Sequence, residues 1–264
     1  LELSPLDREA AIELFLERAA AARPGFVPDA GVRATATRIV ERLDRLPLAI
    51  ELVAPRIAVL APEIILSRLE DRFKLATSAR RDLPERQRTL RAALDWSWEL
   101  LTPAEQTALA QCAVFRGGFL SEDAEEVVSF EDMTNAPWVP DVLQALIDKS
   151  LLRSYEPEDV PGDTRLGMLE SVRAYAAEQL EESGDEPGAV ERHRRVVLAR
   201  AARLAPELLA SDGLRAFRRL ALEADNLSAV MDQADDPETT AQAALMLQEI
   251  LVVRGPAGEH CALL

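Results

Sequence analysis

The stretch Leu151-Leu152-Arg153-Ser154-Tyr155, followed by Arg165-Leu166-Gly167-Met168, decides the fold of this 264-residue chain. Both runs are short and strand-like. The segment between them, Glu156-Pro157-Glu158-Asp159-Val160-Pro161-Gly162-Asp163, is rich in turn-forming residues. Two strand-like runs joined in this way predict a β-hairpin.

Three or four predicted helices precede this hairpin and one follows it. The clearest helix start is Thr102-Pro103-Ala104-Glu105, which has the pattern of a capping box with proline at the first helical position. Further helices are expected to begin at Ser121 and to cover Val139–Lys149 and Glu170–Glu182. Helices followed by a hairpin and one more helix predict a winged-helix domain, over residues 79–184.

The residues on either side of this domain are also predicted to be helical. Residues 1–78 are expected to form a four-helix bundle, whose third helix, Leu48–Leu60, is apolar nearly all round and therefore central. Residues Ala76–Arg88 are polar and basic without apolar periodicity, which indicates a linker. Helices resume after residue 184, and residues 185–264 are predicted to be an α-helical, repeat-like segment.

The composition agrees with a mainly helical protein. Hydrophobic residues make up 48% of the chain, mostly Ala and Leu, and aromatic residues only 5%. No apolar run approaches the roughly 20 residues of a membrane-spanning helix, and no signal peptide is apparent, so we expect a cytoplasmic protein without a membrane partner. Cys112 and Cys261 lie far apart, which predicts neither a disulfide framework nor a metal site.

Three common catalytic motifs are absent from the sequence. It contains no Gly-x-x-x-x-Gly-Lys-Ser/Thr loop to hold phosphates, no His-Glu-x-x-His and no Gly-x-Ser-x-Gly. We therefore expect no catalytic residues and no enzymatic activity in these residues. The chain opens on Leu1 rather than Met, which suggests that it is cut from a longer protein.

Several segments, in order, carry a family resemblance. The first is Leu46-Pro47-Leu48-Ala49-Ile50-Glu51-Leu52, similar to a Gly-Leu-Pro-Leu motif with Arg45 at the glycine position. The others are 87–101, 113–119, 146–152, 168–176 and Glu223-Ala224-Asp225-Asn226-Leu227. Together they resemble the STAND family of signalling NTPases, which is related to the NB-ARC proteins, and the last segment resembles the start of its tetratricopeptide-like sensor.

The resemblance implies a parent ATPase whose P-loop domain lies upstream in the same chain and contacts these helical modules. ADP or ATP with Mg would bind only in that full-length parent, and no cofactor is expected in the isolated chain. The implied cofactor contacts are Leu46, Pro47 and Glu170. Leu169 stands where many members have histidine.

The function implied is a switch in a transcriptional regulator that couples the ADP or ATP state of the P-loop domain to a C-terminal helical-repeat sensor. A protein or small-molecule signal would act at those repeats. Two alternatives stay open: a DNA-binding winged-helix transcription regulator, and a helical scaffold that does not depend on nucleotide.

The charge of the chain argues against DNA as a partner of these residues. The formal net charge is −16, and the helix predicted over Val139–Lys149 has Asp141 and Asp148 against a single lysine. The arginines that follow are interspersed with acids and predict a solvated face: Arg192, Arg194, Arg195, Arg200, Arg203, Arg215, Arg218 and Arg219. We therefore do not expect DNA binding by this part of the protein.

Overall fold

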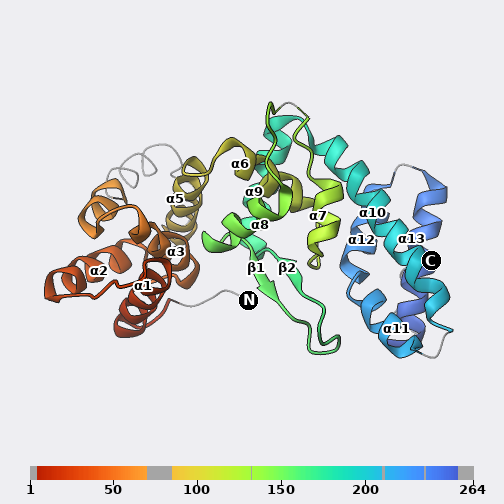
Figure 1. Ribbon diagram of the computed structural model, residues 1–264, viewed down its shortest axis with the longest axis horizontal. Coiled ribbons are helices and arrows are strands. Elements are labelled where there is room, and N and C mark those ends of the chain that lie inside the picture. The colour runs from red at the N-terminus through yellow and green to blue at the C-terminus, as the bar shows by residue number, and fades with distance from the viewer. Residues whose placement is uncertain (1–4, 70–84, 132, 210–211, 235, 255–264) are drawn as a thin grey trace. The chain divides into compact units, whose positions relative to one another are not determined.

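The computed structural model describes residues 5–69, 85–131, 133–209, 212–234 and 236–254 (Figure 1). The chain forms two compact units, residues 1–102 with 148–151 and residues 103–147 with 152–264. Within the described residues, no helix is both long and apolar enough to cross a membrane.

The first unit is helical throughout its described elements. These are α1 (Arg8–Ala22), α2 (Ala30–Arg42), α3 (Pro47–Val53), the 3-10 helix η1 (Ala54–Ala58), a helix over 62–69, and α5 (Glu85–Glu99). The carboxylates of Asp7 and Asp29 accept hydrogen bonds from the first turns of α1 and α2, as N-caps do. The apolar faces of the helices meet in one core, with Phe15, Ile39, Leu43, Ile50, Ile57 and Ile65 fully buried.

Two predictions about the first unit were wrong in detail. The helix expected over Leu48–Leu60 ends at Val53 and continues as the 3-10 helix η1. Pro55 explains the change, because proline has no N–H to donate and its ring clashes with the preceding helical turn. The linker expected over Ala76–Arg88 is helical from Glu85, where α5 begins, and residues 76–84 lie outside the described residues.

The second unit begins with the elements of the predicted winged helix. They are α6 (Pro103–Gln111), η2 (Cys112–Val114), α7 (Ser121–Val127), α8 (Val139–Asp148), β1 (Arg153–Tyr155), β2 (Arg165–Gly167) and α9 (Glu170–Ser183). The two strands are antiparallel, with Ser154 opposite Leu166. A single bridge between Phe119 and Leu166 adds a third chain segment to the small sheet. The predicted fold class, mainly helical with a small hairpin, is confirmed.

Four further helices complete the second unit, and we call residues 186–254 the helical segment. They are α10 (Glu186–Glu207), α11 (Gly213–Ala221), α12 (Ala224–Gln233) and α13 (Pro237–Arg254). Gly184, with φ +79°, separates α9 from α10 in a left-handed conformation that glycine adopts without strain. The helices share a core of apolar side chains that includes Val197, Leu204, Leu220, Leu227, Val230 and Leu247.

Candidate functional site

The exposed face of helix α8 and the hairpin that follows it form the outer surface of the winged helix. Gln144 and Asp141 are exposed on α8, and Arg153 is exposed on β1. Trp138, immediately before α8, is 65% exposed, which is unusual for so large an aromatic side chain. Polar groups of both charges and one aromatic ring are therefore available to a partner on this surface.

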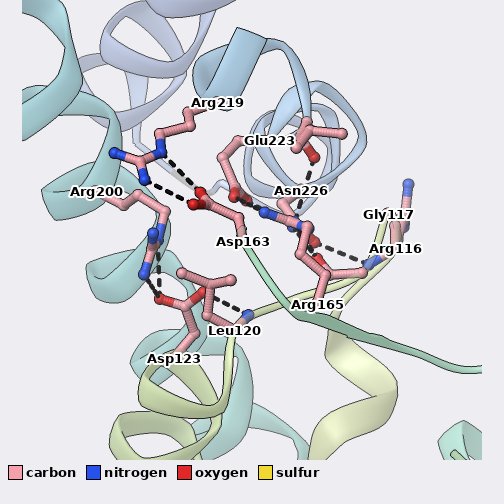
Figure 2. Close-up of polar contacts among 12 residues, drawn as sticks. Arg116, Gly117, Leu120, Asp123, Asp163, Arg165, Arg200, Arg219, Glu223 and Asn226 are labelled. Carbon is pink, nitrogen blue, oxygen red and sulfur yellow. Dashed lines mark hydrogen bonds and ion pairs between the residues drawn. The ribbon is translucent and has the colours of Figure 1, made fainter. Parts of the chain in front are cut away.

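The inner face of the hairpin is held to the helical segment by a buried ion pair. Arg165 on β2 donates to the carboxylate of Glu223, just before α12, at 2.7 Å, and the two side chains are 3% and 2% exposed. Its other terminal nitrogen donates to the carbonyl oxygen of Gly118 at 2.7 Å. Figure 2 shows the Arg165 side chain close to Glu223 and Asn226. Removing one partner of such a desolvated ion pair costs stability, because the other charge stays buried without a partner.

Asn226, on α12, extends this contact to the loop before α7. Its amide oxygen accepts from the backbone N–H of Arg116 at 2.9 Å, and its amide nitrogen donates to the carbonyl of Gly118 and to Glu223, each at 2.9 Å (Figure 2). The side chain is fully buried. One amide thus pairs two backbone groups of the winged helix with a carboxylate of the helical segment. We call Arg165, Glu223 and Asn226 the buried anchor.

A second, more exposed contact joins the tip of the hairpin to α11. Both oxygens of Asp163 accept from Arg219 at 2.7 Å, and Arg215 lies 3.5 Å from the same carboxylate. Arg218 donates to the backbone carbonyl of Asp159 at 3.3 Å. Hydrogen bonding to Arg219 lowers the pKa of Asp163 below its ordinary value and outweighs the effect of partial burial. The carboxylate of Asp163 is therefore paired with arginines of another element.

The arginines expected to form a solvated face instead include several that make contacts within the second unit. Arg200 donates two hydrogen bonds to Asp123 of α7, at 2.9 and 2.6 Å, and both side chains are largely buried (Figure 2). Arg192 donates to the carbonyl of Val127 at 2.6 Å. These partners come from the winged helix, whereas Arg192 also pairs with Asp185 at 3.1 Å and Arg194 with Glu191, which lie near them in the sequence. Arg195, Arg203, Arg215 and Arg218 remain exposed.

His193, on α10, packs against Phe115, the residue before the loop that Asn226 contacts. It is fully buried, its ring stands edge-on to Phe115 with centroids 5.0 Å apart, and neither ring nitrogen has a partner with hydrogen-bond geometry among the described residues. Desolvation by burial lowers its pKa from 6.5 to about 4, against a smaller opposing effect of the Asn226 side chain. The imidazole is therefore neutral at physiological pH.

The cofactor residues suggested by the sequence fall in both units. Leu46 is the N-cap residue of α3 and Pro47 is its first residue, in the first unit. Glu170 begins α9 in the second unit, is exposed, and accepts from Arg173 at 3.0 Å, a contact that lowers its pKa. Each has a local structural role, as a helix start or a first-turn carboxylate. Across the described residues, no group of three or more His, Cys, Asp or Glu could hold a metal ion.

Sequence reasoning did not find the buried anchor. Glu223 and Asn226 stood out only for their resemblance to a helical-repeat start, and Arg165 only as the beginning of a strand. No local signal pairs them, because Arg165 follows Asp163 and Thr164 and Glu223 is followed by Asp225 and Asn226, so neither charge stands alone in an apolar stretch.

Comparison with known proteins supports the winged helix directly. Residues 101–181 match the family "Winged helix-turn-helix domain". The chain is 40% identical over 219 residues to "Putative HTH-type transcriptional regulator Rv0890c" of Mycobacterium tuberculosis H37Rv, covering 83% of this chain and 24% of that protein. A Mycobacterium bovis protein, "Putative HTH-type transcriptional regulator Mb0914c", matches equally well.

A second group of relatives is named as uncharacterized proteins. "Uncharacterized protein Rv0894" of M. tuberculosis H37Rv is 37% identical over 185 residues, covering 70% of this chain and 46% of that protein. The chain thus spans about a quarter of the length of the named regulators and about half of the uncharacterized protein. It contains a winged helix-turn-helix domain and is similar to proteins named as transcriptional regulators.

These findings overturn the prediction that DNA is not a partner of this part of the protein. That prediction rested on the net charge of −16 and on Asp141 and Asp148 in the helix before the hairpin. A winged helix-turn-helix domain and regulator relatives point instead to DNA binding. The error has a physical cause. Net charge governs non-specific attraction to phosphates, whereas base contacts depend on the few side chains that reach a groove.

Proposed function

We propose that this chain is the DNA-contacting and regulatory segment of a transcriptional regulator, with its winged helix-turn-helix domain as the module that meets DNA. The observation that carries the proposal is the succession of α7, α8 and the β1–β2 hairpin within the residues that match the winged helix-turn-helix family. Similarity to proteins named as transcriptional regulators supports it.

Helix α8 is the element proposed to read bases. In helix-turn-helix proteins the second helix of the motif lies in the major groove. The exposed Gln144 fits adenine, whose major-groove edge offers a donor and an acceptor to an amide, and the exposed Asp141 can accept from the amino group of cytosine. Arg153, exposed on β1, is suited to a phosphate.

The charge of the chain shapes how such binding would behave. With a net charge of −16, non-specific attraction to the DNA backbone is weak. Affinity would then depend on base contacts more than on counterion release. The proposal therefore predicts a strong preference for one sequence, and a shallower salt dependence than that of basic DNA-binding domains.

Selection from a pool of duplexes with a randomised centre tests this proposal. Repeated binding and amplification at low salt should enrich one sequence, and Gln144→Ala should weaken binding to it and relax the preference at one position. Gln242→Ala, which removes the same side chain from an exposed site on α13, should change neither. A pool that stays random after selection would overturn the proposal.

A second candidate function is favoured by the buried anchor, because it joins the winged helix to the helical segment within one unit. We propose that the helical segment transmits a signal to the winged helix. In the finer form of this idea, the parent is a STAND-type ATPase, this chain itself is not an enzyme, and Leu46, Pro47 and Glu170 contact ADP or ATP with Mg held by an upstream P-loop domain. Calorimetry should then detect no micromolar nucleotide binding to the isolated chain, and Pro47→Ala in the parent should speed ADP release. ADP release unchanged by Pro47→Ala would contradict the role of that residue.

A further inference from the structure

The tip of the hairpin is unusual for a surface that approaches DNA. Residues 156–164 contain Glu156, Glu158, Asp159 and Asp163 and no basic residue. Alone, this tip would repel the phosphates beside a groove, because salt screens like charges poorly when they are closer than a Debye length. Within residues 101–181 the tip therefore adds only negative charge, and the exposed Arg153 on β1 is the basic residue assigned above to a phosphate.

Helix α11 supplies positive charge from outside the matched domain. Arg219 pairs with Asp163 through two hydrogen bonds of 2.7 Å. Arg218 donates to the backbone carbonyl of Asp159, a neutral group, so in the described part of the chain its charge stays uncompensated there. Arg215 is 47% exposed and lies 3.5 Å from a carboxylate that already has Arg219. Beside the tip, Arg218 thus keeps an uncompensated charge, and Arg215 shares the single charge of Asp163 with Arg219.

The buried anchor fixes this arrangement. Glu223 follows α11 by two residues and binds Arg165 on β2, and Asn226 binds the loop at Gly118. Because both contacts are desolvated, α11 does not separate from the hairpin without exposing a buried ion pair. In Figure 2 the Asp163 and Arg165 side chains come from one chain segment, the end of the hairpin loop and the start of β2, and each points to a partner from the helical segment.

We propose that α11 and the hairpin form one composite surface for the DNA backbone, in which Arg215 and Arg218 contact phosphates beside the groove occupied by α8. The proposal rests on the DNA binding proposed above and extends the DNA-contacting unit from residue 181 to at least α11. Arg219 is a positioning residue in this surface, since its charge is paired with that of Asp163. Phosphate contacts set register and affinity but carry no base preference.

The salt dependence of DNA binding by the full 264-residue chain tests this inference. Each phosphate contact contributes about 0.9 to the slope of log affinity against log salt concentration. Arg215→Gln with Arg218→Gln should lower the slope by about 2 and weaken binding at low salt, while the sequence preference stays unchanged. The matched control, Arg23→Gln with Arg195→Gln, removes the same charge from exposed sites outside α11 and the hairpin and should leave the slope near that of the wild type.

The outcomes separate the two proposals. An equal slope in both double variants, in a chain that binds the selected duplex, would overturn the composite surface and leave the DNA-binding proposal standing. No binding of any duplex by the wild type would overturn both. Urea unfolding of each variant shows whether the anchor is intact, and Arg218→Lys, which keeps the charge, should recover most of the slope. If it does not, Arg218 does not act through phosphate.

Discussion

The guanidinium of Arg165 lies 2.7 Å from the carboxylate of Glu223, although the two residues are 58 positions apart in the chain. Arg165 lies on strand β2 and Glu223 in the turn between α11 and α12, and both side chains are buried. A buried ion pair stabilises the fold little more than apolar residues of the same size would. Removing one partner alone is strongly destabilising, because the remaining charge is then buried without a partner. The pair therefore specifies how the hairpin meets the helical segment.

Removing one member of this pair should destabilise the second unit strongly. Glu223→Ala leaves the Arg165 charge buried and unpaired, and we expect a loss of about 3–5 kcal/mol in the free energy of unfolding, measured in urea. The double variant Arg165→Met with Glu223→Leu should lose less than Glu223→Ala alone. Glu170→Ala, which breaks the exposed pair with Arg173, should cost under about 1 kcal/mol. A double variant as unstable as the single one would contradict the role assigned to the charge pair.

The amide of Asn226 should be as important as the ion pair. Asn226→Ala leaves the N–H of Arg116 and the carbonyl of Gly118 without this partner, each at a cost of about 1–3 kcal/mol if it stays buried. Asn226→Asp should be worse near neutral pH, because a carboxylate would face Gly118 oxygen and Glu223. Thermal unfolding near pH 7 compares them. If Asn226→Asp is more stable than Asn226→Ala, the hydrogen bonds that the Asn226 amide nitrogen donates are not important for stability.

Two glycines in the same conformation should respond differently to alanine. Gly118 has φ +93°, and an added Cβ would lie 2.4 Å from the Tyr155 hydroxyl and 3.0 Å from the Leu166 carbonyl. Gly162 has φ +87°, but no atom lies within 4 Å of the same position. Gly162→Ala should cost about 1–2 kcal/mol for the backbone conformation alone, and Gly118→Ala clearly more. Equal losses in the free energy of unfolding in urea would mean that the hairpin shifts to make room for the added methyl group.

Stability should fall on mild acidification because of His193. Burial lowers its pKa from 6.5 to about 4, so between these values the unfolded chain binds a proton that the folded chain does not. The contribution is complete above about pH 6.5 and is lost as pH falls, by up to about 1.4 kcal/mol per pH unit. From about pH 7.5 to about pH 5 we expect a loss near 2 kcal/mol in urea unfolding.

A variant isolates this effect from other titrations. His193→Phe keeps a planar ring against Phe115 and removes the titrating group, so the decline between about pH 7.5 and about pH 5 should become smaller by that amount. The lowered pKa of Asp163 contributes only at lower pH, where its carboxylate is protonated. An unchanged decline in the variant would show that another group takes up the proton.

Local signals in the sequence were sufficient for the elements of the winged helix. Pro103 and Ser121 begin helices as predicted, the hairpin lies where two strand-like runs flank a turn-rich segment, and α9 begins at Glu170. Each signal acts within a few residues, through a fixed φ, a capping group or a residue that tolerates a turn. The helix break at Pro55 was equally local, although the apolar run around it favoured one continuous helix.

Only the tertiary structure decided which side chains meet. Nothing near Arg165 in the sequence indicates Glu223, and nothing near Asn226 indicates Gly118, because side-chain pairing across the fold depends on the packing of whole elements. The net charge of −16 is fixed by composition, yet it does not say that Arg215 and Arg218 lie at the acidic tip of the hairpin. Composition sums charge over the chain, whereas recognition depends on where the fold places each charge.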